Sequence, residues 1–335
     1  MGPTGTTVQK RNDGRVLVTG ANGFVGRALV RTVIDTGRHV RAAVRHLDRA
    51  DGPFGDWSAV GDVGPETDWF NSLRDVDAVI HLVARTHVLR DPEKNLQLYR
   101  RTNVDGTRRL AEQAAAAGVR RLVFVSSIKV NGERTFQRAY GPDDVPAPED
   151  AYGLSKHEAE QIVARIAEAS GMEHVIVRPP LVYGPGVKGN FPRLIRLVQK
   201  GVPLPLASVQ NQRSMVALEN LVDLLVRCID APGATGRTLL VRDEETLSTP
   251  GLIRHVASAL GRPVHLFPVP TALLYILGRL TGRTSEIQRL CGSLVVDDSE
   301  TRRLLEWSPP VFAQDAIRAT VADFLKRKAI ARDDQ

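Results

Sequence analysis

Short runs of β-branched and apolar residues alternate with stretches of helical periodicity through the first half of this 335-residue chain. "RVLVT" at 15–19 is typical of a buried strand, and apolar residues at helical spacing follow it over 25–33. The strand pattern recurs at 39–44, 58–62, 77–83, 121–127 and 174–178, with helical stretches near 65–74, 93–117 and 152–170. This alternation predicts right-handed βαβ units and a parallel sheet covered by helices on both faces.

The character of the chain changes after Arg178, where "PPLVYGPGVKGNFP" begins a segment of shorter elements and more turns. We therefore expect an α/β protein with a doubly wound, Rossmann-type dinucleotide-binding domain at 14–180. A disordered tail would precede it at 1–13, and a smaller, mostly C-terminal α/β substrate-binding cap would occupy 181–335, with some elements returning to the sheet. The ligand site is expected in the cleft outside the carboxyl ends of the strands.

Composition limits the partners and the location. The net charge of +7 comes from scattered arginines, and a small anionic ligand would account for it as well as a nucleic acid would, so composition alone does not decide between them. Because the cations form no stripe and aromatic residues are sparse, no nucleic-acid partner is expected. No apolar run reaches 18 residues, so no membrane span is expected, and "PTALLYILGRL" at 270–280 is predicted to be a packed or interfacial helix. With no secretory signal and only Cys228 and Cys291, a cytoplasmic protein without a metal site is expected.

"TGANGFVG" places Gly20, Gly23 and Gly26 between the first strand and the first helix. Glycines there permit a tight turn and close approach to a pyrophosphate, which the N-terminus of the helix stabilises. An acid at the end of the second strand would hold the ribose 2′-hydroxyl of NAD, but this chain has Arg45, with Arg41 nearby. We therefore favour NADP(H), with NAD as the alternative.

Tyr152 and Lys156 lie one helical turn apart, 25 residues or more after Ser127 at the end of a predicted strand. An ammonium group beside a phenol lowers the pKa of the phenol, which would make Tyr152 a general acid/base near neutral pH. Ser127 would hydrogen-bond the same substrate oxygen while hydride moves to or from a nicotinamide. A Tyr-x-x-x-Lys pair alone is weak evidence, and its position downstream of the glycine turn and Ser127 makes it specific.

These motifs resemble those of the extended short-chain dehydrogenase/reductase family, in its nucleotide-sugar epimerase, dehydratase and reductase branch. The resemblance covers nearly the whole chain and rests on "VTGANGFVG" (18–26), "HLVA" (81–84), "NVDGT" (103–107), "VSSIKVNGE" (125–133), "YGLSKHEAE" (152–160) and "RPPLVYGPG" (178–186). In the predicted cap, "GNFPRLIRLV" (189–198) and "NQRSMVALENLVD" (211–223) resemble the substrate-binding segments of that branch.

The resemblance implies a catalytic set of Ser127, Tyr152 and Lys156, with Lys156 also a ribose ligand. It places Asn190 and Arg213 at the diphosphate of a nucleotide sugar. Asn103 matches the structural and proton-relay asparagine of the family. Apart from the resemblance, Asp62 closes the predicted strand at 58–62, where its carboxylate would either accept a hydrogen bond from the adenine amino group or cap the next turn. The full set of expected cofactor-binding residues is Gly20, Asn22, Gly23, Phe24, Val25, Gly26, Arg45, Asp62, Val63, Leu82, Ala84, Asn103 and Lys156. The family also implies a homodimer.

Two departures from the pattern bear on the reaction. Sugar-nucleotide 4,6-dehydratases carry an Asp-Glu pair after the catalytic serine or threonine, and Ile128-Lys129 stands here instead, which argues against dehydration. Leu181 stands where the branch commonly has an asparagine, so no diphosphate contact is expected from it.

Redox chemistry at C4 of a nucleotide-diphosphate sugar is therefore the leading hypothesis. The distal segment 287–311 looks most like UDP-2-acetamido-sugar 4-ketoreductases of polysaccharide biosynthesis, so reduction of a UDP-4-keto-6-deoxy-N-acetylhexosamine is favoured over the alternative, a UDP-hexose 4-epimerase of the UDP-glucose type. A reductase of hydrophobic carbonyls fits poorly with the cations of the cap. A non-catalytic NADP sensor fits poorly with an intact Tyr152 and Lys156.

Overall fold

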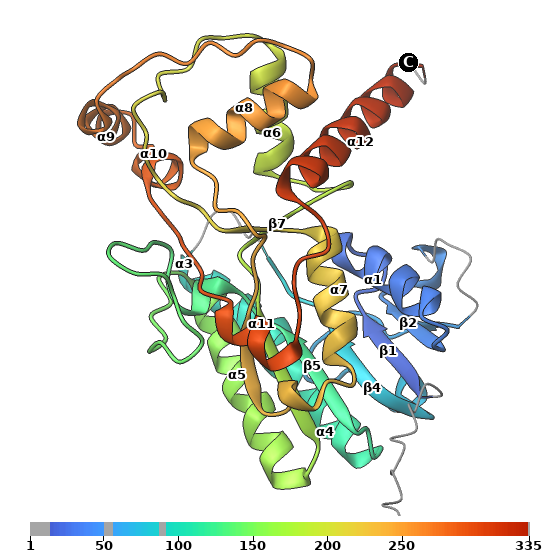
Figure 1. The fold of residues 1–335 in the computed structure, drawn as a ribbon. Helices are drawn as coiled ribbons and strands as arrows, with labels where there is room; N and C mark the ends of the chain where they lie inside the picture. Colours follow the sequence, from blue (N-terminus) through green and yellow to red (C-terminus); the bar gives the residue numbers. More distant parts are fainter. Residues whose placement is uncertain (1–13, 50–55, 87–91, 334–335) are drawn as a thin grey trace, which may run out of the picture.

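A parallel sheet of seven strands forms the centre of the protein in a computed structural model that describes residues 14–49, 56–86 and 92–333 (Figure 1). Its spatial order is β3-β2-β1-β4-β5-β6-β9. The strands are β1 (Arg15–Thr19), β2 (Val40–Val44), β3 (Trp57–Ala59), β4 (Val76–His81), β5 (Arg121–Val125), β6 (Glu173–Arg178) and β9 (Arg237–Leu240). The predicted doubly wound α/β class is confirmed; the tail predicted at 1–13 lies outside the described residues.

The order of the strands creates the crevice in which a ligand would bind. From β1 the chain builds outward through β2 and β3, and it then crosses to β4 on the other side of β1. Every pairing in the sheet is parallel, so the loops after β1 and β4 diverge from adjacent carboxyl ends. Such a reversal is the usual position of a ligand in this class of fold.

Helices cover both faces of the sheet, because its central strands are apolar on both sides. On one face α1 (Phe24–Asp35) packs beside α7 (Leu218–Cys228), and the chain around α11 (Ser299–Leu305) adds to that layer. The opposite face carries α2 (Phe70–Leu73), α4 (Gly106–Ala116) and α5 (Ala151–Ser170). These two layers hold α1 and α5, the two helices that the sequence assigns to the site, against the same sheet.

A second apolar core lies beyond the sheet, in the upper part of Figure 1. It is built around a pair of parallel strands, β7 (Leu181–Tyr183) and β8 (Met215–Ala217). The helices around it are α6 (Asn190–Gln199), α8 (Thr249–Ala259), α9 (Thr271–Leu280), α10 (Thr284–Cys291) and α12 (Ala313–Asp333). Within the described ranges, no helix has both the length and the hydrophobicity to cross a bilayer.

Two predicted elements are shorter than the sequence suggests. The helix predicted near 65–74 is reduced to α2, because the chain before it turns through Thr67, whose hydroxyl oxygen accepts a hydrogen bond from Gly64 N at 2.9 Å. The strand predicted at 58–62 ends at Ala59, because Gly61 has a φ of +67°, which extended chain does not adopt. Asp62 therefore lies in the loop after β3 and does not close the strand.

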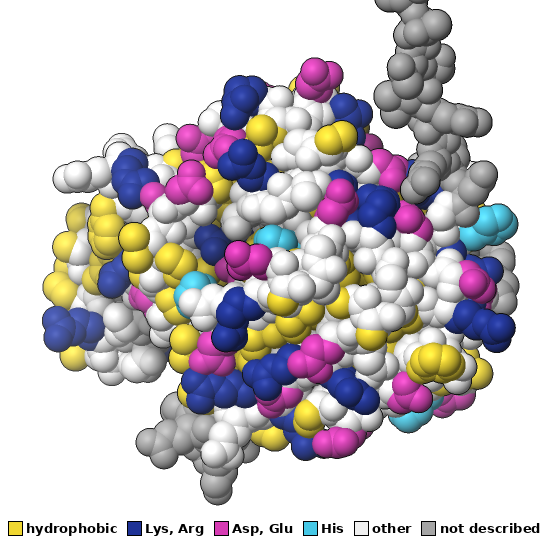
Figure 2. All heavy atoms as spheres, turned by 90° about the horizontal axis from the view of Figure 1, so that it is seen from below, with side chains coloured by type: hydrophobic (Ala, Val, Ile, Leu, Met, Phe, Trp, Pro, Cys, Tyr) yellow, Lys and Arg dark blue, Asp and Glu magenta, His cyan; other side chains and the backbone are white. Residues whose placement is uncertain are grey.

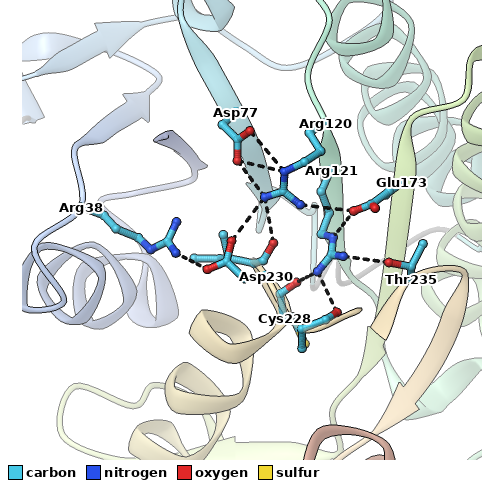
Figure 3. Close-up of polar contacts among 10 residues, drawn as sticks. Arg38, Asp77, Arg120, Arg121, Glu173, Cys228, Asp230 and Thr235 are labelled. Carbon is cyan, nitrogen blue, oxygen red and sulfur yellow. Dashed lines mark hydrogen bonds and ion pairs between the residues drawn. The ribbon is translucent and has the colours of Figure 1, made fainter. Parts of the chain in front are cut away.

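A charged network ties the amino-terminal edge of the sheet to the chain after α7 (Figure 3). Arg121, only 2% exposed, donates to Glu173 at 2.7 Å and to the carbonyl oxygens of Cys228 and Ala231. Arg120 bridges Asp77 and Glu173. Because these residues begin β5 and β6, they stand at the edge opposite the crevice. Part of the arginine excess is therefore structural.

Candidate functional site

The glycine turn after β1 has the geometry that a pyrophosphate requires. Gly20 has a φ of +68°, and a Cβ added at Gly26 would lie 2.2 Å from the carbonyl oxygen of Gly20. Helix α1 begins at Phe24 with no side-chain cap at Gly23 and no acidic residue in its first turn. Its first N–H groups are therefore uncapped and unopposed by negative charge, which fits a bound phosphate group.

The loop after β4 lies directly against this turn. A Cβ on Gly20 would lie 3.4 Å from Cγ2 of Val83, and Leu82 N donates to the hydroxyl oxygen of Thr19 at 3.1 Å. Leu82 and Ala84 are half-buried in this loop. The structure thus brings two of the predicted cofactor-binding segments together. Of the other turn residues, Asn22, Phe24 and Val25 are half-buried at the start of α1.

At the end of β2, Arg45 forms an ion pair with Asp62, with Nε and Oδ1 2.8 Å apart. Both side chains are exposed, at 61% and 83%. Arg41 points into the fold instead, where it pairs with Asp56 and donates to carbonyl oxygens in α2 and at the residue that follows it. Arg41 is therefore a structural residue, and Arg45 already has a carboxylate partner.

Val63, half-buried next to Asp62, packs against Gly106.

The candidate acid/base Tyr152 and its partner Ser127 meet across the crevice. Ser127 follows β5 and caps the short helix η3 (Ile128–Val130), its oxygen accepting from Lys129 N at 3.3 Å. Tyr152, in the first turn of α5, shares a side-chain hydrogen bond with Ser127. Burial, and then the neighbouring Asp150 and Tyr99, raise the pKa of Tyr152, and the bond to Ser127 acts in the opposite direction. These surroundings therefore favour the protonated phenol over the phenolate.

Lys156 packs against the ring of Phe124, and the expected lowering of the pKa of Tyr152 by its ammonium group stays a prediction. Its Nζ lies 3.9 Å from the centroid of the Phe124 ring, and its side chain is 1% exposed. Burial lowers the pKa of Lys156 to about 7, and Glu160 opposes this shift. The helical spacing correctly puts both residues on α5, and the ammonium group of Lys156 packs on β5.

Asn103 joins the loop after β4 to α5. It lies in a π-helical segment, η2 (Arg100–Asp105), and is fully buried. Its side-chain oxygen accepts from Arg85 N at 2.7 Å, and its nitrogen donates to the hydroxyl oxygen of Ser155 at 2.9 Å. Asn103 therefore holds the start of α5, which carries Tyr152, in a fixed position relative to the cofactor-side loop.

Two further supports of the site were not predicted. His81 lies buried between the hydroxyl groups of Thr19 and Thr107, at 2.7 and 3.1 Å, and burial followed by the charge of Lys156 lowers its pKa to about 3. The second support is the ion pair of Glu160 on α5 with Arg178 at the end of β6, both at most 5% exposed. Both supports could have been suspected from the sequence, because each involves a polar residue within an otherwise apolar strand or helix pattern.

Lys129, at the position where the dehydratases carry an acid, clamps the loop after Ser127 to α5. Its ammonium group binds Glu133 at 2.7 Å and also Asp150. The other oxygen of Asp150 accepts from Gly153 N at 2.7 Å and so caps the helix that bears Tyr152. Lys129 thus neutralises the carboxylate that raises the pKa of Tyr152.

Lys129→Met is expected to move the rise of kcat/KM with pH toward higher pH, which lowers activity at neutral pH about tenfold for each pH unit that the rise moves. The reason is that an unneutralised Asp150 raises the pKa of Tyr152 further. A pH–rate profile measures the displacement, and Lys129→Arg, which keeps the charge, should lie close to the wild type. A Met variant with the wild-type profile would show that the clamp has no electrostatic role.

Arg213 lies on the same side as this clamp. The loop after Ser127 and the chain around Arg213 both pair with the segment 293–297, through Tyr140 N to Val295 O at 2.9 Å and Ser214 N to Leu294 O at 2.8 Å. Burial and then Arg289 lower the pKa of Arg213, and Glu133 opposes them. Its Nη1 donates to the carbonyl oxygens of Arg289 and Gly292. Among the described residues no carboxylate forms an ion pair with it.

The guanidinium group of Arg213 therefore lies against the backbone of Arg289 and within reach of its positive charge, which suits an anion. Arg289 was not predicted, because it lies 76 positions further along the chain. Asn190 is exposed at the first residue of α6 and makes no side-chain hydrogen bond within the described part of the chain. Leu181 is 49% exposed in β7 and brings no polar group, as expected.

Comparison with known proteins agrees with this geometry. The model of the NAD dependent epimerase/dehydratase family matches residues 16–241. A UDP-glucose 4-epimerase of Vibrio cholerae is 45% identical over 316 residues, which is 93% of this chain and 95% of that protein. An N-acetyl-alpha-D-glucosaminyl-diphospho-ditrans,octacis-undecaprenol 4-epimerase of Escherichia coli O157:H7 is 25% identical, over 93% of this chain and 96% of its own length.

Solved structures share the fold. A UDP-glucuronic acid 4-epimerase from Bacillus cereus, in complex with NAD, superposes with a TM-score of 0.75 at 20% identity, over 93% of this chain and 99% of that one. The family match, the relative at 45% identity and the shared topology agree on the extended short-chain dehydrogenase/reductase superfamily. The chain is therefore an enzyme of the NAD-dependent epimerase/dehydratase family.

Proposed function

We propose that this enzyme is a 4-epimerase of a nucleotide-diphosphate sugar, with UDP-hexose as the substrate class. The observation that carries the proposal is the 45% identity to the Vibrio cholerae UDP-glucose 4-epimerase over nearly the whole length of both chains. The hydrogen-bonded Ser127 and Tyr152 at the crevice supply the groups that C4 chemistry needs. Lys129, in place of an acid, leaves water elimination without its proton donor.

In this proposal the phenolate form of Tyr152 removes the proton from the C4 hydroxyl, and Ser127 donates a hydrogen bond to the same oxygen. The nicotinamide, when bound, would take the hydride from C4 and return it to the opposite face of the sugar. Tyr152 then returns its proton to the oxygen, so the substrate and product are isomers and no reductant is consumed. Gly20, Gly23 and Gly26 would hold the cofactor pyrophosphate, and Arg213 with Arg289 the sugar diphosphate.

The same residues would serve a 4-ketoreductase, which the sequence pattern alone favoured. That preference rested on the resemblance of segment 287–311 and on the absence of an acid at the end of the second strand, where Arg45 now pairs with Asp62. The relatives compared above favour the alternative, because the names of both are those of 4-epimerases. We therefore place epimerisation ahead of reduction.

We infer that NAD is the cofactor. A 2′-phosphate at the end of β2 would meet the exposed carboxylate of Asp62, and it would have to compete with that carboxylate for Arg45. NAD is expected to bind at least about tenfold more tightly than NADP, measured by calorimetric titration of the purified protein. Asp62→Asn should reduce the difference between the affinities for NAD and NADP. If the wild type bound NADP more tightly than NAD, NAD would be excluded as the preferred cofactor.

Arg213→Ala is expected to raise the KM for the nucleotide sugar by roughly 10- to 100-fold, because a charge-assisted bond to phosphate contributes about 1.5–3 kcal/mol. NAD binding should be unchanged. Arg318→Ala is the matched control, because Arg318 is 62% exposed and pairs with Asp315 on α12, so its removal should leave KM unchanged. An unchanged KM in Arg213→Ala would remove this residue from the diphosphate site.

The proposal is tested by incubating the purified protein with UDP-glucose and following UDP-galactose without added reductant. UDP-N-acetylglucosamine, tested in parallel, defines the tolerance at C2. Interconversion without net change in absorbance of reduced nicotinamide supports the epimerase. Stoichiometric NADPH oxidation by a UDP-4-keto-6-deoxy-N-acetylhexosamine, with no interconversion of any hexose, would support the reductase instead. A homodimer and a cytoplasmic location stay predictions.

A further inference from the structure

Helix α9, whose sequence is "TALLYILGRL", presents an apolar face to solvent. Leu273, Ile276, Leu277 and Leu280 are exposed by 49%, 52%, 55% and 79%. They are spaced at i, i+3, i+4 and i+7, so they form one continuous stripe along the helix. A contiguous stripe of this kind on a soluble protein marks an interaction surface, because single exposed leucines are common but clustered ones are not.

The other face of α9 already serves the cap. Leu274 is 4% exposed in the cap core, and Gly278 packs so closely on α10 that a Cβ there would lie 2.8 Å from Ile287 Cγ1. The backbone of Arg283 closes this helical hairpin by donating to Gly278 O at 2.7 Å. The orientation of α9 is therefore fixed by packing, and its apolar stripe is held outward on a rigid pair of helices at the outer edge of the cap (Figure 1).

Basic residues accompany the stripe. From 262 to 288 the chain carries Arg262, Arg279 and Arg283 against a single acid, Glu286, and it has no lysine or aspartate there. Glu286 is itself within 4.0 Å of Arg283. Hydrophobic side chains, with Lys or Arg side chains beside them, gather at the left edge of Figure 2, the edge where Figure 1 places α9 and α10.

We propose that α9 and α10 dock this enzyme on the surface of an anionic phospholipid bilayer. The apolar stripe would insert below the head groups and the arginines would contact lipid phosphates, as in other in-plane amphipathic helices. At ten residues α9 is far too short to span the bilayer, so the docking is peripheral and reversible. This role goes beyond the proposed catalytic function and does not depend on it.

The charge beside the α9 stripe also argues against a second copy of the chain as the partner that covers it. A two-fold interface sets the same patch against itself, so the arginine-rich rims of two copies would face each other with one glutamate each to offset them. An anionic bilayer pairs with those same arginines. The charge pattern thus favours lipid over self-association.

The test is flotation of the full-length protein with vesicles of phosphatidylcholine and phosphatidylglycerol, compared with vesicles of phosphatidylcholine alone. The wild type is expected to float with the anionic vesicles and to dissociate as salt is raised. A double variant, Ile276→Ser with Leu277→Ser, and the charge variant Arg279→Glu with Arg283→Glu should each lose roughly tenfold or more in partition. Phe312→Ser, which removes an apolar side chain that is 69% exposed elsewhere, should float like the wild type.

Catalytic activity without vesicles and the thermal midpoint report whether each variant is folded, and flotation itself requires no activity. An enzyme without epimerase activity could therefore still float with the vesicles, and an active epimerase could fail to float, so the two proposals are tested separately. The inference is overturned if the wild type does not float with anionic vesicles, or if the stripe variants float like the wild type. A stripe variant that instead changes the oligomeric state by light scattering would assign the surface to a second copy, and that too would overturn it.

Discussion

Replacing Tyr152 with phenylalanine is expected to lower kcat by roughly 10³-fold while the affinity for NAD stays within about twofold of the wild type. The phenol oxygen is the proposed proton acceptor at C4, and it shares a hydrogen bond with Ser127. The ring is half-buried beside Tyr99, with centroids 6.1 Å apart, and phenylalanine keeps that packing. The loss should therefore fall on turnover and leave folding and cofactor binding intact.

Tyr275→Phe is the matched control, because it removes the same hydroxyl from a half-buried tyrosine on α9, away from the crevice. Its kcat should equal that of the wild type. Both variants are compared under saturating nucleotide sugar, with NAD binding measured separately by calorimetry. A Tyr152→Phe protein that retains even a tenth of the wild-type kcat would exclude Tyr152 as the acid/base.

The second large effect is on stability. Glu160→Gln is expected to lower the free energy of unfolding by roughly 3–5 kcal/mol, because it leaves the buried Arg178 guanidinium without its carboxylate. Arg178 donates to Glu160 at 2.9 and 2.6 Å and also to Asn131 at 3.0 Å, so it joins α5, β6 and the loop after Ser127. Chemical denaturation of the wild type and the variant, compared at the same pH, measures the difference.

Glu158→Gln supplies the control from the same helix. Glu158 pairs with Arg100, whose side chain is 46% exposed, and an exposed pair contributes at most about 1 kcal/mol. If the free energy of unfolding falls by the same small amount in both variants, the buried pair of Glu160 and Arg178 contributes no more to stability than the exposed pair.

The pH dependence of the Glu160 effect has a definite sign. Burial would raise the pKa of Glu160, but hydrogen bonds from His157 and Arg178, together with the charge of Arg178, hold this pKa below its usual value. A carboxylate with a lowered pKa in the folded state stabilises the protein above its pKa in the unfolded chain and loses that contribution as pH falls through the folded value. The difference between the wild type and Glu160→Gln should be constant above about pH 5 and shrink in more acidic solution.

Local sequence patterns predicted the fold well because the relevant physics is local. Continuous apolar runs such as "RVLVT" require strands buried on both faces, and Gly20, Gly23 and Gly26 between a strand and a helix specify the tight turn. The position of Tyr152 in the first turn of a helix followed from periodicity in the same way. The spacing of four residues also placed Lys156 on the same helix.

Partners that are distant in the chain could not be predicted from those patterns. The pairing of Arg45 with Asp62, and the stacking of Lys156 on Phe124, depend on which loops and strands become neighbours in space. Arg289 meets Arg213 only because the segment 293–297 pairs with the chain on either side of it. The electrostatics of the site, including the raised pKa of Tyr152, follow from these long-range contacts.

In the proposed epimerisation, hydride leaves and re-enters C4 within one binding event. Incubation of the enzyme with UDP-glucose that carries deuterium at C4 tests this transfer. We expect UDP-galactose that retains the deuterium at C4, with no hydrogen taken from solvent and no net oxidation or reduction of nicotinamide. Product that has lost the deuterium from C4, or no UDP-galactose at all while a 4-keto sugar is reduced by NADPH, would contradict it.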